Sequence, residues 1–207
     1  MRPLRSPKEG NHPLSEILQT LGTRRSVPLP LMSAPGPDAA ELEQILTIAS
    51  RVPDHGKLAP WRFIVYRGEA AAAIGEALLA IVEGRDGDAI TETRRHAERT
   101  RFTRAPVVVG VISTAKPHVK IPEWEQQLSG AAAAMNLTTA ANALGYGTNW
   151  LTEWVAYDDE AKAVLGIAPD EKVIGFIHIG TRAEVIEDRP RPALADIVTE
   201  AKATGLR

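Results

Sequence analysis

The sequence contains no cysteine among its 207 residues. This absence excludes disulfides, thiolate metal sites, iron–sulfur clusters and cysteine nucleophiles. Any redox chemistry that the protein performs must therefore come from a bound cofactor.

Long apolar runs and a strong net charge are missing too. No segment reaches the roughly 18 apolar residues of a membrane span, and residues 1–18 hold no apolar run long enough for a signal peptide. The formal net charge of −2 argues against a dedicated binder of polyanions. We therefore expect a cytoplasmic protein with neither a nucleic-acid partner nor a membrane partner.

The common motifs of hydrolases, zinc enzymes and phosphate-binding loops are also absent. The sequence has no G-x-S-x-G, no H-E-x-x-H and no G-x-x-x-x-G-K-[ST]. Its histidines never lie close enough along the chain to form a usual ligand pair, so we expect no metal site. Gly145 and Gly147 follow a helix and lack a third glycine, which favours a helix cap at Gly145 and a tight turn at Gly147 over a dinucleotide-binding loop.

The composition is that of an ordinary globular protein, with 44% hydrophobic and 24% charged residues. The length suits one sizeable core, and neither a linker nor an internal repeat is visible. We therefore predict a single domain over residues 1–207. Residues 1–13 are expected to be flexible, and residues 183–207 are expected to form an extended C-terminal arm or tail.

Hydrophobic periodicity predicts several helices and few strands. Between the first two helices a proline-rich segment is extended, and residues 146–152 turn away from the longest helix. Few strands among many helices favour an α+β fold or a three-layer sheet covered by helices. The predicted helices cover residues 13–22, 37–51, 69–83, 88–102, 122–145 and 158–166, and the predicted strands cover residues 62–67, 106–113 and 172–181.

Two short basic segments suggest anion binding. Arg24, Arg25 and Ser26 follow the first helix, and their guanidinium forks and hydroxyl suit a phosphate or a carboxylate. A solvated basic pair that stabilises a helix C-terminus is the alternative. Near the C-terminus, Arg189 and Arg191 are separated by prolines and taken alone resemble a mobile basic tail.

The loop "RVPDHGKLAPWRF", residues 51–63, contains the adjacent pair Asp54 and His55. Adjacent side chains diverge, so this pair cannot form a catalytic unit by itself. We expect Trp61 to anchor the loop onto the core. We expect Asp54 to cap the loop through backbone amides.

Five segments in order resemble one family. They are "RRS", "R-x-PDH-x(4)-PW-x-F", "P-x-WEQ", "G-x-G-x-x-W" and "GF-x(3)GT". Over residues 14–195 they are similar to the FMN-dependent nitroreductases, above all to the short NAD(P)H nitroreductases of the YdjA type. The resemblance implies a nitroreductase-like three-layer α-β-α sandwich with a mostly antiparallel central sheet. It also implies an intertwined homodimer with FMN at the subunit interface, each site drawing residues from both chains.

The resemblance also implies which residues bind FMN. Arg24, Arg25 and Ser26 match the first FMN segment, with arginine on the phosphate and the others near the ribityl chain and the ring. Arg51 and His55 match the contribution of the partner chain.

Two further segments match the family. Trp150, Leu151 and Thr152 match the segment along the isoalloxazine, which acts largely through its backbone. Arg189 and Arg191 match a phosphate-binding basic pair, for which Arg182 is a competing ligand. The family places a pyridine-nucleotide stretch at residues 140–145, which in this chain is interpreted as packed core or dimer interface.

Two positions depart from the family pattern. Many relatives have an amide side chain before "PW", where this chain has Ala59. YdjA-type proteins often have "WRS" where this chain has "WLT", so Leu151 removes a charge beside the flavin. Either change could shift the reduction potential or the choice of substrate.

The function implied is an FMN-dependent oxidoreductase that passes hydride from NADH or NADPH to nitroaromatics, quinones or similar small oxidants by a ping-pong mechanism. The flavin carries the chemistry, so no catalytic side chain is assigned. The alternatives are another reaction type of the superfamily, such as dehalogenation, flavin fragmentation or heterocycle dehydrogenation, and an FMN-binding protein without turnover. No 2′-phosphate pocket is recognised, since the basic run of residues 94–101 is equally well a solvated helix face.

Overall fold

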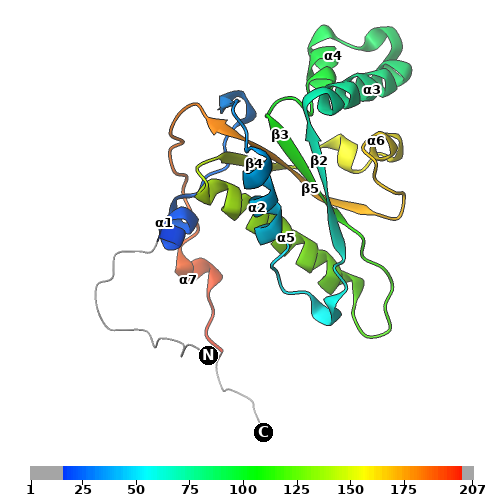
Figure 1. The fold of residues 1–207 in the computed structure, drawn as a ribbon. Helices are drawn as coiled ribbons and strands as arrows, with labels where there is room; N and C mark the ends of the chain where they lie inside the picture. The colour runs from blue at the N-terminus through cyan, green and yellow to red at the C-terminus, as the bar shows by residue number, and fades with distance from the viewer. Residues whose placement is uncertain (1–15, 202–207) are drawn as a thin grey trace.

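The computed structural model describes residues 16–201 (Figure 1). The flexibility expected of residues 1–13 lies outside this range. The helices are α1 (Glu16–Thr23), α2 (Ala39–Ala49), α3 (Gly68–Asp86), α4 (Glu92–Arg99), α5 (Glu123–Ala143), α6 (Asp159–Val164) and α7 (Leu194–Ile197). The strands are β1 (Met32–Ser33), β2 (Trp61–Arg67), β3 (Val107–Ser113), β4 (Gly147–Leu151) and β5 (Lys172–Arg182).

Local sequence explains where α2 begins and which face it buries. The Asp38 carboxylate accepts a hydrogen bond from the Glu41 backbone N–H at 2.9 Å, and the Glu41 carboxylate accepts one from the Asp38 N–H at 3.0 Å. This reciprocal pair is a capping box. Leu42, Ile45 and Ala49 then fall on one buried face, as their spacing predicts.

The strands form one sheet in the order β1-β5-β3-β2, and β4 pairs with β5. All of these pairings are antiparallel, which confirms the predicted sheet. Helices α2 and α5 pack on one face, around Ile45, Leu137 and Ile177. On the other face α3 and α6 pack over Val108 and Phe176, so the three-layer arrangement is confirmed (Figure 1).

The turn predicted for residues 146–152 is wrong, because Gly147–Leu151 is the strand β4. β5 is 11 residues long and offers β4 an edge from Phe176 to Gly180. A tight turn at Gly147 is therefore wrong as well. The cap at Gly145 is confirmed, since this residue follows α5 with a left-handed φ of 93°.

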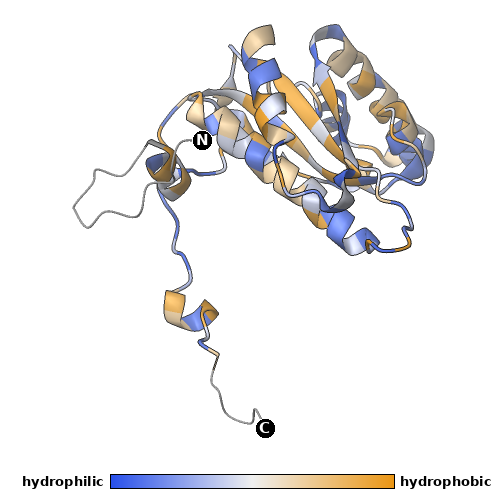
Figure 2. Ribbon diagram, turned by 60° about the horizontal axis from the view of Figure 1, so that its bottom comes forward, coloured by the Kyte–Doolittle hydropathy of each residue, from blue (hydrophilic) through white to orange (hydrophobic). Residues whose placement is uncertain are grey.

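Beyond β5 the chain leaves the sheet. Figure 2 shows residues 183–201 extending away from the sheet and its covering helices, with the single short helix α7 on the way. The apolar side chains of α7 are uncovered, and Leu194 is 72% exposed. Within residues 16–201, no helix is both long and apolar enough to cross a membrane.

Candidate functional site

Residues 24–26 lie beside β4. Ser26 forms a parallel bridge with Thr148, and the Val27 N–H donates to the Thr148 carbonyl at 2.9 Å. The side-chain amide of Asn149 returns a hydrogen bond to the Val27 carbonyl at 2.8 Å. These contacts bring the first predicted FMN segment next to the strand that carries Trp150 and Leu151.

Four arginines predicted to bind FMN converge at this edge. The Arg25 guanidinium donates to the Glu187 carbonyl and lies 3.6 Å from the Asp188 carboxylate. Asp188 also pairs with Arg191 at 3.1 Å. Burial lowers the pKa of Arg24, and the positive charges of Arg191, Arg25 and Arg189 lower it further.

These arginines repel one another, and a phosphate bound between them would neutralise the excess positive charge and relieve that repulsion. Asp188 offsets part of the charge, through its contacts with Arg25 and Arg191. The alternative of a solvated basic pair does not account for Arg25, whose side chain is mostly buried against the tail. The arrangement favours an anion-binding site.

Arg182 adds a further positive charge close by. Together with Arg25 it lines a cavity of about 350 Å³ between the first FMN segment and the start of the tail. Gly147 lies behind it, where a Cβ atom would come within 2.7 Å of the Arg182 side chain and 2.9 Å of Val27. Only glycine therefore lets β4 approach this closely, and Arg182 remains an alternative phosphate ligand.

The end of β4 borders a second, larger cavity. The Trp150 indole lies across Gly175 of β5 and donates to the Ile174 carbonyl at 3.1 Å. Leu151 faces a cavity of about 620 Å³ whose walls are mostly apolar. The other residues that line this cavity are Leu29, Pro30, Met32, His96, Ala97, Thr100, Arg104 and Asn149.

The loop that follows α2 is held rigidly. The Asp54 carboxylate accepts hydrogen bonds from the N–H groups of Leu58 and Ala59 at 3.1 and 2.8 Å, which confirms its predicted capping role. The Trp61 indole donates to Ser129 on α5 at 3.1 Å, and the Ser129 hydroxyl donates to Pro53 at 2.7 Å. The predicted anchoring by Trp61 is confirmed.

His55 lies far from the arginine cluster within one chain. Its Nδ1 lies 2.8 Å from a carboxylate oxygen of Glu125, in the first turn of α5. Thr148 is tied by a 2.7 Å hydrogen bond to Asn142, in the last turn of α5. Since a helix rises 1.5 Å per residue and Asn142 comes 17 residues after Glu125, the two regions are separated by about 25 Å.

Arg51 lies between these regions, where its carbonyl accepts a hydrogen bond from Asn136 at 3.0 Å. The pairing of His55 with Glu125 spans 70 residues of sequence. The sequence signal for it was that Glu125 is the glutamate of the motif "P-x-WEQ". One chain by itself does not bring His55 to the arginine cluster.

The basic run of residues 94–101 is the expected solvated face only in part, since Arg94 and Arg99 are exposed. Arg101 is buried and donates twice to the buried Glu98 at 2.7 Å. Arg94, Arg95 and Arg99 also pair with carboxylates. The alternation of Glu and Arg at helical spacing was the available signal. Since these charges are paired, the run does not form a ready pocket for a 2′-phosphate.

Two other regions bear on the predicted site. Ala140 and Ala141 are buried in the core between α5 and the sheet, which confirms the interpretation as packed core for these two residues. Between residues 16 and 201, no three His, Asp or Glu side chains group closely enough to hold a metal ion.

The segments around β4 fall within a known family. The family model described as "Nitroreductase family" matches residues 21–181. The chain belongs to the nitroreductase family. It is 31% identical over 168 residues to "Putative NAD(P)H nitroreductase YdjA" of Escherichia coli (strain K12), which covers 80% of this chain and 88% of that protein. It is 35% identical over 174 residues to a similarly named protein of Haemophilus influenzae, covering 83% of this chain and 91% of that protein.

Solved nitroreductase structures show the same fold. A nitroreductase-like protein from Bacillus cereus superposes with a TM-score of 0.76 at 21% identity, covering 94% of this chain and all of that chain. A nitroreductase in complex with FMN from Desulfovibrio desulfuricans gives a TM-score of 0.67 at 24% identity, covering 90% and 96%. Family membership and the names of these nitroreductases support an oxidoreductase.

Proposed function

We propose that this nitroreductase-family protein is an FMN-dependent oxidoreductase that takes hydride from NADH or NADPH and passes it to small oxidants such as nitroaromatics and quinones. The observation that carries the proposal is the convergence of Arg24, Arg25, Arg189 and Arg191 beside β4. A relative of known structure binds FMN, and FMN carries a phosphate that such a cluster fits.

The residues present fit FMN along its length, from the phosphate through the ribityl chain to the isoalloxazine ring. The arginines hold the phosphate, and Ser26 lies next to Thr148 at a place suited to the ribityl hydroxyls. The backbone of Trp150, Leu151 and Thr152 offers donors and acceptors to the isoalloxazine edge. When bound, FMN supplies hydride acceptance and donation, and the chain supplies position, charge and a shielded surface.

The proposed active form is a homodimer with FMN at the subunit interface. His55 is about 25 Å along α5 from the β4 end of the same chain, so a site that uses both needs a second copy. Apolar side chains at the ends of α5 and on the tail are uncovered, including Trp124 at 66% and Leu194 at 72% exposure. Exposed apolar surface of this kind favours burial against another chain.

Nicotinamide and oxidant would use the same place in turn, as a ping-pong mechanism requires. The cavity of about 620 Å³ next to Leu151 is large enough for a flat aromatic ring, and its walls are mostly apolar. The apolar walls suit a planar ring, and the positive charge of Arg104 at the edge suits a polar, reducible group on that ring. The oxidants most suited to the cavity are therefore planar rings that carry a reducible group.

The test begins with purified protein and its visible absorption spectrum. Protein with bound FMN is yellow, and anaerobic NADH or NADPH should bleach it. A steady-state screen of nitroaromatics, quinones and free flavins with both nicotinamides then identifies the oxidant. Colour without bleaching would favour an FMN-binding protein without turnover, and a colourless protein that FMN cannot restore would overturn the proposal.

A further inference from the structure

Glu153 has a backbone conformation that is rare for a residue with a side chain. Its φ of 56° and ψ of −176° lie in a region that is essentially restricted to glycine. The residue follows Thr152 and precedes the 3-10 turn η4 (Trp154–Ala156). A strained conformation persists only where surrounding contacts hold it.

The Glu153 carboxylate makes contacts of that kind. It lies 2.5 Å from a guanidinium nitrogen of Arg104 and 2.6 Å from one of Arg101. Burial raises the pKa of Glu153, but the hydrogen bonds and charges of Arg104 and Arg101 outweigh burial and lower it overall. The side chain is therefore an anion held between two cations.

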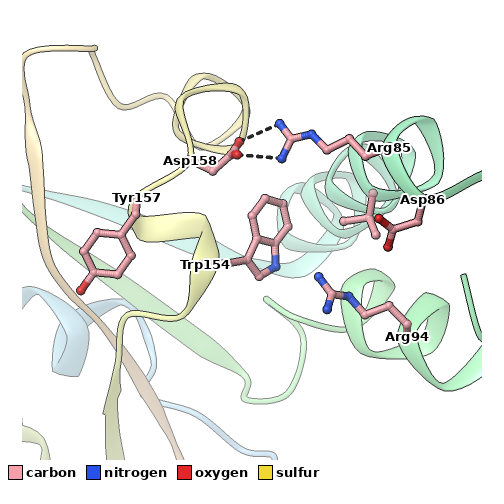
Figure 3. A pocket seen from close by; sticks show the side chains of 7 residues that line it. Arg85, Asp86, Arg94, Trp154, Tyr157 and Asp158 are labelled. Atoms are coloured by element: carbon pink, nitrogen blue, oxygen red, sulfur yellow. Dashed lines mark hydrogen bonds and ion pairs between the residues drawn. The ribbon is translucent and has the colours of Figure 1, made fainter.

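The two ion pairs of Glu153 with Arg101 and Arg104, called the clamp below, are held in place by other residues. The Arg101 side chain is 8% exposed and is held by Glu98, which is fully buried. Glu98 also accepts hydrogen bonds from the Trp154 indole at 3.1 and 3.2 Å. Figure 3 shows Trp154 facing Arg85 and Arg94 in a cavity of about 420 Å³, where Arg85 is in turn paired with Asp158.

Trp154 is anchored further by cations. The guanidinium carbons of Arg101 and Arg85 lie 5.9 and 6.0 Å from the centre of its ring, which is within range of a cation–π contact. Glu153 is thus held by its side chain and by the residue that follows it. The chain cannot relax at Glu153 without turning the peptide group that joins it to Thr152.

We propose that Glu153 is a positioning residue, whose ion pairs with Arg101 and Arg104 hold the left-handed backbone and so orient the peptide groups at the end of β4 towards the flavin. This inference rests on the proposed FMN site. It assigns to the "WLT" segment a fixed geometry that the following glutamate supplies. The strain at Glu153 is offset by its ion pairs with Arg101 and Arg104.

The test compares Glu153→Ala with Glu153→Gly. Alanine loses the clamp and keeps the strain, so the dissociation constant for FMN should rise by about tenfold or more. Glycine loses the clamp but accepts the conformation, so its dissociation constant should stay within about threefold of the wild type. If the carboxylate served only to neutralise the two arginines, both variants would lose affinity equally, and that result would overturn the proposal.

A second comparison covers the case in which Glu153→Ala does not fold. Arg104→Gln removes one of the clamping cations and should weaken FMN binding in the wild-type background. In the Glu153→Gly background the same substitution should leave the dissociation constant for FMN unchanged, since glycine adopts the conformation without the two ion pairs. Equal losses in both backgrounds contradict the proposal.

A measurement without flavin separates this inference from the proposed function. In the apoprotein the N–H groups of Ala156 and Tyr157 donate to the carbonyls of residues 153 and 154 at 3.3 and 3.0 Å. Glu153→Ala should speed amide hydrogen exchange at Ala156 and Tyr157, while Glu153→Gly should leave it closer to the wild type. If the wild type fails to bind FMN, the proposed function fails and the exchange rates still report on the clamp. If the wild type binds FMN and Glu153→Ala changes neither the FMN affinity nor the exchange rates, the positioning role of Glu153 is disproved.

Discussion

Arg24 is the residue on which the proposed cofactor site depends most directly. It is partly buried next to three other arginines, so an anion gains more from it than from a solvated cation. Arg24→Ala should raise the dissociation constant for FMN by at least about tenfold, since a charge-assisted hydrogen bond contributes about 1.5–3 kcal/mol. Flavin titration of the apoprotein measures this.

Arg99→Ala is the matched control for Arg24. Arg99 is an arginine on α4 that pairs with Glu76 at 3.0 Å, away from the cluster, so its loss should leave FMN binding unchanged. Equal FMN affinities for the Arg24 and Arg99 variants would show that the arginine cluster does not bind the phosphate.

His55 is the residue expected to contact the flavin of the partner. Its ring is largely exposed, apart from its contact with Glu125. His55→Ala should weaken flavin retention or slow turnover while the melting temperature stays close to that of the wild type. Glu125→Gln, which alters the partner of His55 and keeps the ring, is the control. Full flavin occupancy with unchanged rates in His55→Ala would contradict this role.

His178 makes stability depend on pH. Burial, aided by the charge of Arg104, lowers its pKa from 6.5 to about 4. The unfolded chain therefore binds a proton at a higher pH than the folded protein does. The stabilisation is fully present above pH 6.5 and is lost as the pH falls towards 4, by up to about 3 kcal/mol. Urea unfolding at several pH values measures the loss, and His178→Gln should show a flatter profile.

At the scale of elements, β4 depends on a close contact with β5. A Cβ atom at Gly175 would lie 2.0 Å from the Trp150 indole nitrogen, so Gly175→Ala must displace the ring. We expect about 1–3 kcal/mol of destabilisation and weaker FMN binding, because the end of β4 moves with Trp150. Denaturant unfolding and flavin titration measure the two effects.

Gly84→Ala provides the comparison for Gly175. Gly84 lies in α3 with nothing near the position of an added Cβ, and alanine favours a helix. This substitution should leave stability unchanged or slightly raised. A Gly175→Ala protein as stable as the Gly84→Ala protein would show that the Trp150 contact contributes little.

At the scale of the whole molecule, the proposed site takes residues from two chains. At a limiting FMN concentration, where each variant alone is largely without flavin, co-expression of an Arg24→Ala chain with an Arg51→Ala/His55→Ala chain should restore activity above that of either variant alone. With random pairing, half of the dimers contain one intact site of two, so about a quarter of the wild-type activity should return. Steady-state assays of the mixed and separate proteins measure the recovery.

Co-expression of Arg24→Ala with Arg25→Ala is the control for this experiment. Both substitutions fall in the same segment, so every site in every dimer lacks one arginine and no activity should return. Recovery in neither mixture would indicate a site built within one chain.

The sequence by itself determined the features that depend on neighbouring residues or on the order of motifs. The helices followed from hydrophobic periodicity, as the buried face of α2 shows, and the fold followed from the resemblance of five ordered segments to one family. The capping role of Asp54 was likewise local, because its partners lie four and five residues away.

The tertiary structure alone decided what depends on partners far along the chain. β4 is a strand because an edge of β5 pairs with it, and Arg101 is buried because α4 packs Glu98 against Trp154. The left-handed Glu153 is held by arginines about fifty residues earlier, a pairing that no local pattern encodes. Strand pairing and charge burial are settled by long-range packing, whereas caps and helix faces are settled within a few residues.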